Sequence, residues 1–115
     1  MNKRKKRGGA MKFLKKPSRF GGTWYEGEVD GYYVYVRVFE APSKYGINDG
    51  KISALTIYRK KGDSLKDALA NYDRGWDGTL PSAKFRPIVD KIVQYFDGRK
   101  VDWEWEAQRH KALSD

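Results

Sequence analysis

The chain has 115 residues, of which 39% are hydrophobic and 15% are aromatic, so its length allows one small domain whose core depends on large apolar side chains. It has no cysteine and a single histidine, His110, which excludes a disulfide framework, thiolate chemistry and a histidine-rich metal site. The sequence contains no apolar run of membrane-spanning length and no apolar signal-peptide region at its start, so we expect a cytoplasmic protein with no membrane partner.

The net charge of +9 is concentrated at the N-terminus. Residues 1–22 contain no acidic residue and nine basic residues: Lys3, Arg4, Lys5, Lys6, Arg7, Lys12, Lys15, Lys16 and Arg19. The other 15 basic residues are balanced by 15 acidic residues. This composition predicts a flexible basic arm over residues 1–22, which ends at Gly21-Gly22 and precedes a formally neutral domain.

A β-hairpin is predicted from Trp24 to Glu40, because Asp30-Gly31 provides a two-residue turn between segments rich in Val and Tyr. Counting back from the turn gives the expected cross-strand pairs: Val29 with Tyr32, Gly27 with Val34, Tyr25 with Val36, Glu28 with Tyr33, Glu26 with Tyr35, and Trp24 with Arg37. One face should then bury Val29, Val34, Val36 and Val38. The opposite face should carry Glu26, Glu28, Tyr33, Tyr35 and Arg37.

The next segments predict further strands and one helix. A third strand is expected within residues 51–60, and a fourth within residues 68–73, where a helical turn is the alternative. From Ser82 to Phe96, apolar residues recur every three or four positions, which predicts a helix packed against the sheet and ended by Asp97-Gly98. Pro87 argues against a start at Ser82, so the helix either begins nearer Phe85 or bends.

The last segment, residues 99–115, is rich in tryptophan and acidic residues. Val101, Trp103 and Trp105 alternate as they would in a strand, and the residues that follow are helix-like. The whole pattern predicts an α+β fold in which residues 23–98 form a three- to four-stranded antiparallel sheet with one helix packed on a face.

The first interpretation of the basic arm is that it binds nucleic acid, either RNA or DNA, because Lys and Arg displace condensed counterions from phosphates. If about five of these charges met duplex phosphates, the slope of log affinity against log salt would be near −4.5. An acidic protein or membrane surface, a nuclear localisation signal and a solubilising tail are the alternatives. Phe13, Leu14 and Phe20 either bury on a partner or pack back on the domain.

Two sets of aromatic residues are candidate partner-binding residues. Tyr33, Tyr35 and Arg37 would form a sheet surface for stacked bases, but Glu26 and Glu28 across the hairpin would repel phosphate, which favours a structural role. Trp103 and Trp105 would anchor a protein interface. Their acidic neighbours instead favour an edge strand that charge protects from aggregation: Asp102, Glu104 and Glu106.

The stretch NYDRGWDG is the most distinctive internal motif. Asp73 and Asp77 would provide oxygen ligands for a divalent cation or a catalytic carboxylate. A structural corner, with Trp76 in the core and the aspartates capping backbone or paired with Arg74, is favoured. The sequence has no Gly-rich phosphate loop, nucleophile elbow or zincin motif, so we expect a non-enzyme without catalytic residues, metal or cofactor.

Three stretches, TWYEGEV, YGINDGKISALTIY and NYDRGWDG, occur in an order that resembles a family of small uncharacterised proteins of phages and mobile elements of Gram-positive bacteria. In that family a Trp-x-x-Gly strand, a Gly-Ile-x-x-Gly-[Arg or Lys]-Ile-Ser turn and a Tyr-Asp-Arg-Gly-Trp-Asp segment recur. The resemblance covers Trp24 to Phe96 and leaves out the arm and the tail. It implies a bacterial host cell and, because small phage proteins commonly inhibit host defence, a role of anti-CRISPR type against an RNA-guided nuclease.

The leading prediction is therefore a non-enzymatic accessory protein that binds nucleic acid, or a nucleoprotein such as an RNA-guided nuclease, through its basic arm. The alternative is an inhibitor that docks on a host defence nuclease through its folded body. A small metal-dependent enzyme that uses Asp73 and Asp77 is the least favoured. The pattern leaves the oligomeric state open.

Overall fold

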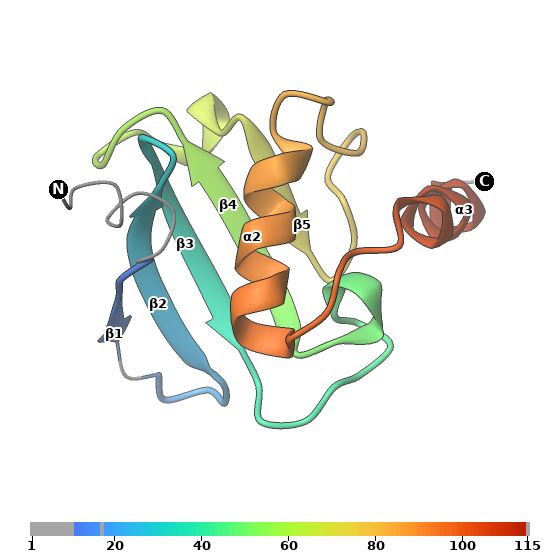
Figure 1. Cartoon of the computed structure of the whole chain (residues 1–115), viewed down its shortest axis with the longest axis horizontal. Helices are drawn as coiled ribbons and strands as arrows, with labels where there is room; N and C mark the ends of the chain where they lie inside the picture. Colours follow the sequence, from blue (N-terminus) through green and yellow to red (C-terminus); the bar gives the residue numbers. More distant parts are fainter. Residues whose placement is uncertain (1–10, 17, 115) are drawn as a thin grey trace, which may run out of the picture.

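The computed structural model describes residues 11–16 and 18–114, which form an antiparallel sheet in the order β1-β2-β3-β4-β5. The fold is α+β, as predicted. The predicted count of three or four strands and one helix is wrong, because the described residues alone form five strands and two helices (Figure 1). The strands are β1 (Phe13–Lys16), β2 (Thr23–Val29), β3 (Tyr32–Val38), β4 (Ile52–Tyr58) and β5 (Ala70–Asp73). The helices are α2 (Arg86–Asp97) and α3 (Trp103–Ser114), and two short 3₁₀ turns are η1 (Ile47–Asp49) and η2 (Leu65–Asp67).

The β2–β3 hairpin has the register that its turn predicts. All six cross-strand pairs expected from the sequence are present, from Val29 with Tyr32 to Trp24 with Arg37. Asp30 and Gly31 both have positive φ, 52° and 87°, as a two-residue hairpin turn of type I′ requires. The turn therefore determines which residues of both strands face the core.

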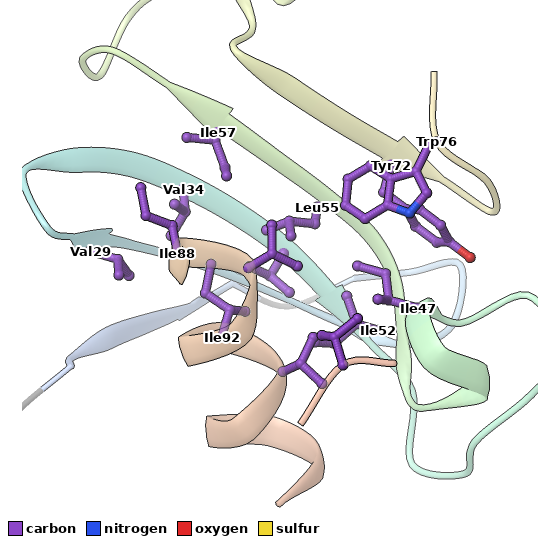
Figure 2. Packing of buried hydrophobic residues seen from close by; sticks show 14 residues of the cluster. Val29, Val34, Ile47, Ile52, Leu55, Ile57, Tyr72, Trp76, Ile88 and Ile92 are labelled. Carbon is purple, nitrogen blue, oxygen red and sulfur yellow. The ribbon is translucent and has the colours of Figure 1, made fainter. Parts of the chain in front are cut away.

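The core lies between the sheet and α2 (Figure 2). Val34 and Val36 of β3 and Leu55 and Ile57 of β4 meet one apolar stripe of α2, and these side chains are buried. The stripe recurs every three or four residues, as predicted, and consists of Ile88, Val89, Ile92 and Val93. Val38 is partly buried at the margin of this core.

Helix α2 begins at Arg86, after Phe85, so the later of the two predicted starts is confirmed. Pro87 then lies in the first turn, where its missing N–H group removes no helical hydrogen bond. Gly98 ends the helix with φ at 72°, and its N–H donates to the carbonyl of Gln94 at 2.9 Å.

Strand β1 lies within residues 1–22, the range predicted as a basic arm. β1 pairs with β2, with Phe13 opposite Gly27 and Lys16 opposite Trp24. Gly27 makes this approach possible, because a Cβ atom there would lie 2.6 Å from the Lys12 carbonyl oxygen. The Phe13 ring packs 5.1 Å from the Phe96 ring on α2. Phe13 therefore packs back on the domain, one of the two predicted outcomes, whereas Leu14 is 61% exposed.

The tail forms a helix, and the predicted edge strand through Val101, Trp103 and Trp105 is wrong. Asp102 caps the start of α3, since its Oδ1 accepts a hydrogen bond from the Trp105 N–H at 3.0 Å. Glu104 lies in the first turn, where a negative charge suits the helix dipole. Neither helix has the length and apolar character needed to cross a bilayer, among the residues that the structure describes.

The fourth predicted strand is present as β5, and η2 provides the helical turn just before it. β5 runs antiparallel to β4, with Leu55 opposite Tyr72 and Thr56 opposite Asn71. The Thr56 hydroxyl donates to the Asn71 side-chain oxygen at 2.7 Å, a polar pair on the face away from α2. The predicted strand and the helical turn that was its alternative are therefore both present, one after the other.

Candidate nucleic-acid interface

The sheet face opposite α2, here called the open face, is left uncovered by that helix (Figure 1). Because side chains alternate along a strand, the measured register identifies its members. They are Leu14, Lys16, Trp24, Glu26, Glu28, Tyr33, Tyr35, Arg37, Ala54, Thr56, Tyr58, Asn71 and Asp73. The predicted polar face of the hairpin is thus part of a continuous surface that spans the sheet.

A stacked aromatic pair occupies the open face between β2 and β3. The rings of Trp24 and Tyr35 have centroids 4.6 Å apart and planes inclined by 18°. The Arg37 guanidinium lies 5.8 Å from the Trp24 ring centroid and 4.9 Å from that of Phe39. Its Nη2 donates to the Phe20 carbonyl at 2.7 Å, which fixes this planar cation next to the rings. Aromatic rings and planar guanidinium groups are the side chains on which nucleic-acid bases stack.

Glu26 is almost buried on the same face, at 8% exposure. The Tyr33 hydroxyl donates to its Oε1, and the ammonium groups of Lys16 and Lys61 lie 3.8 and 3.9 Å from its Oε2. The hydrogen bond from Tyr33 and the two lysines hold the pKa of Glu26 below its ordinary value. Burial and the same hydrogen bond raise the pKa of Tyr33. The negative charge of Glu26 is therefore balanced by neighbouring groups. Glu26 should repel an approaching phosphate less strongly than the sequence alone predicts.

Tyr33→Phe is expected to weaken the pH dependence of folding in the acid range. Because the folded pKa of Glu26 lies below 4.5, its ordinary value, Glu26 stabilises the fold above that pH and loses this effect as pH falls through the folded pKa. Removing the donated hydrogen bond should raise the folded pKa and so reduce the difference in unfolding free energy between neutral and acid pH. Urea unfolding across this range measures the effect, with Tyr35→Phe as the control. Identical pH profiles for Tyr33→Phe and the unaltered chain would contradict it.

The predicted nucleic-acid-binding residues are divided by the structure. Lys16 lies on the open face, opposite Trp24, and Lys15 points to the α2 side of the same strand. Lys12 precedes β1 and lines a shallow groove with Leu14 and Tyr33, while Arg19 is exposed after β1. The other five predicted residues lie outside the described residues: Lys3, Arg4, Lys5, Lys6 and Arg7.

The predicted partner-binding residues do not form one surface. Tyr33, Tyr35 and Arg37 share the open face, as expected. Trp103 instead contacts α2, because its Nε1 donates to Asp90 Oδ1 at 3.0 Å and the Arg86 guanidinium lies 5.0 Å from its ring centroid. Trp105 on α3 is 40% exposed.

Two aromatic residues of the NYDRGWDG motif, Tyr72 and Trp76, lie in the core. Trp76 is buried and its ring packs edge-on against Tyr72, with centroids 4.9 Å apart (Figure 2). Arg74 pairs with Asp73 at 4.0 Å, as the structural interpretation predicts. Among residues 11–16 and 18–114, no three His, Cys, Asp or Glu side chains are grouped closely enough to hold a metal ion.

A buried carboxylate that the sequence did not reveal joins this motif to α3. Glu106 is completely buried. Its Oε2 accepts the Asn48 N–H at 2.6 Å, and its Oε1 accepts the Trp76 indole N–H at 2.8 Å. Arg109 Nη2 also donates a hydrogen bond to Oε2, at 3.0 Å. The Glu-x-x-Arg spacing on a helix was the available signal, since side chains three residues apart lie on one face.

Arg109 connects the same helix to the loop before β4. Its guanidinium donates to the carbonyls of Lys44 and Gly46, at 2.9 and 3.2 Å, and to the Tyr72 hydroxyl at 2.8 Å. Gly46 has no room for a side chain, because a Cβ atom would lie 2.0 Å from the Gly50 carbonyl oxygen. The YGINDG loop and the NYDRGW turn thus form a polar socket for α3.

A domain of unknown function, DUF7678, matches residues 23–97. The chain belongs to this family. No curated protein and no solved structure gives a match. The match to the DUF7678 domain runs from the start of β2 to the end of α2, so it includes Tyr72, Trp76 and most of the open face. β1, Glu106 and Arg109 lie outside it.

Proposed function

We propose that this protein binds nucleic acid, either free or within a nucleoprotein complex, through its basic N-terminal segment and the adjacent open face. The observation that carries the proposal is the pairing of Lys16 with Trp24, which puts one cation of the acid-free segment next to the stacked aromatic pair. Cations that attract phosphate and rings that stack with bases are the two components of single-strand binding.

The distribution of charge supports different roles for the basic segment and the open face. All the excess positive charge belongs to residues 1–22, because the remaining basic and acidic residues balance. The basic segment would supply attraction that depends on salt, and the open face would supply contacts with bases. A single strand is favoured over a duplex, because only unpaired bases expose their faces to aromatic side chains.

A phage or mobile-element setting, with an RNA-guided nuclease as the nucleoprotein, belongs to this proposal and rests on the sequence resemblance alone. The alternative of an inhibitor that docks through Tyr33, Tyr35, Trp103 and Trp105 has less support. Trp103 is engaged with α2, and so the four aromatic residues do not present one docking surface.

Replacing the stacked pair tests the proposal. The double variant Trp24→Leu and Tyr35→Leu keeps apolar side chains on the open face but removes the rings, and should weaken binding to a 12-nucleotide single strand about tenfold or more. Fluorescence anisotropy measures the affinity, and circular dichroism verifies the fold. Trp105→Leu, on α3, is the matched control and should bind normally. Equal affinity of the double variant and the unaltered chain would refute the role of the open face.

A further inference from the structure

A groove opens at the end of the sheet where β2 begins and β3 and β5 end. The residues that line it include Arg37, Phe39, Tyr45, Ser53, Asp73 and Arg74. Arg37 belongs to the open face as well, where its guanidinium lies over the Trp24 ring. The groove is therefore continuous with the stacked aromatic pair.

Ser53 is the unusual residue of this groove. The register between β3 and β4 shifts between Arg37 and Val38, and Ser53 lies at this irregularity. The residue is 6% exposed, and its hydroxyl is the one buried side-chain polar atom without a hydrogen-bond partner in the part of the chain that the structure describes. Such a hydroxyl is unfavourable for folding, because it loses its contacts with water and gains none in exchange. A ligand in the groove would supply the missing partner.

The charges of the groove indicate an uncharged ligand. Two arginines, Arg37 and Arg74, are matched by two acids, Glu40 and Asp73. The Arg74 side chain is 70% exposed, and Asp73 lies 4.0 Å from its Nε. The lining thus has no net formal charge, and it combines donors and acceptors with the rings of Phe39 and Tyr45. This combination suits a planar heterocycle with its own donors and acceptors better than it suits a phosphate.

We propose that the groove binds one base of a single-stranded nucleic acid, with Ser53 and Arg74 hydrogen-bonded to the base edge, next to the strand stacked on Trp24 and Tyr35. This inference rests on the proposed function and adds base selectivity to it. Phosphate contacts are independent of sequence, whereas base-edge contacts depend on it. The open face holds the strand, and the groove selects a base.

Ser53→Ala separates a binding role from a structural one. Removal of an unpaired hydroxyl should leave the melting temperature unchanged or raise it. The same change should lower affinity for the preferred single strand about 3- to 10-fold, the value of one hydrogen bond. Ser114→Ala, at an exposed position on α3 outside the groove, is the matched control and should change neither quantity.

The closing experiment titrates the full chain and Ser53→Ala with four 12-nucleotide DNA homopolymers at one salt concentration. The proposal expects the full chain to prefer one base and the variant to lose that preference. Equal affinities of the full chain for all four strands, or the same preference in both proteins, would overturn the groove proposal and leave the proposed function standing. Binding of none of the four strands, together with none of the matching RNA strands, would overturn the proposed function itself.

Arg74→Gln is a second variant that does not endanger folding, because the side chain is largely exposed. It should reduce base preference in the same titration, whereas Lys111→Gln on α3 removes the same charge outside the groove and should retain the preference. Equal loss in both variants would show a general charge effect and would overturn the assignment of Arg74 to a base edge.

Discussion

Glu106→Ala is expected to lower the free energy of unfolding by about 3 to 5 kcal/mol, or to release α3 from the body. Three donors converge on this fully buried carboxylate: the Asn48 N–H, the Trp76 indole and the Arg109 guanidinium. The substitution would leave all three without this acceptor, and the nearly buried Arg109 would keep only its ion pair with the exposed Asp49, whose Oδ1 lies 3.2 Å from Nη1. Loss of one member of a buried ion pair is far more unfavourable than loss of an exposed one.

Denaturant unfolding and hydrogen exchange of the α3 amides measure this effect. Exchange would identify release of the helix, which unfolding alone would miss if the sheet and α2 remain folded. Glu104→Ala is the control, because Glu104 lies in the same first turn but is exposed. A change below about 1 kcal/mol for Glu106→Ala, with protected α3 amides, would contradict the role assigned to the socket.

Deletion of residues 1–10 is expected to weaken binding to a single strand about a thousandfold at 0.1 M salt, because five cations that each release about 0.7 of a counterion are removed. These cations are Lys3, Arg4, Lys5, Lys6 and Arg7. The cut must come before β1, since a longer deletion would remove the strand that pairs with β2. A variant with glutamine at the same five positions controls for chain length and should bind as weakly as the deletion.

The unfolding free energy of the deletion variant should stay close to that of the full chain, because β1 and the Phe13 contact with Phe96 are retained. Isothermal titration measures the affinity, and thermal unfolding verifies the fold. An affinity within threefold of the full chain would contradict the role of the basic segment.

The hairpin and α2 are predictable because their determinants are local. A two-residue turn at Asp30-Gly31 fixes the register, and period-two alternation then assigns each side chain to a face. The apolar spacing of α2 defines one buried stripe, and Gly98 ends the helix. The same register and alternation predict that Tyr33, Tyr35 and Arg37 lie on one face.

The two ends of the chain were not predictable in this way. Strand β1 is short and half of its residues are charged, and its pairing depends on space above Gly27, a residue distant in sequence. The tail alternates as a strand does, yet a local cap at Asp102 and long-range hydrogen bonds to Glu106 make it helical. Tertiary contacts override a short period-two pattern in this segment.

The sequence places Tyr35 and Arg37 on one face of the sheet, but it does not predict the geometry of the candidate site or the part that Trp24 takes in it. The expected repulsion from Glu26 did not allow for its contacts with Tyr33, Lys16 and Lys61. Neither the stacking of Trp24 with Tyr35 nor the unpaired Ser53 hydroxyl has a sequence signature, because both depend on how neighbouring strands meet.

The salt dependence of binding to a 12-nucleotide single strand tests the central claim most directly. Affinity measured between 0.05 and 0.3 M salt should fall on a log–log plot with a slope near −3.5, as about five phosphate contacts on a single strand predict. The deletion of residues 1–10 should make that slope much shallower, because Lys12, Lys15, Lys16 and Arg19 are the basic residues of the segment that remain. A slope near zero for the full chain, or an equally steep slope after the deletion, would contradict the assignment of nucleic-acid attraction to the basic N-terminal segment.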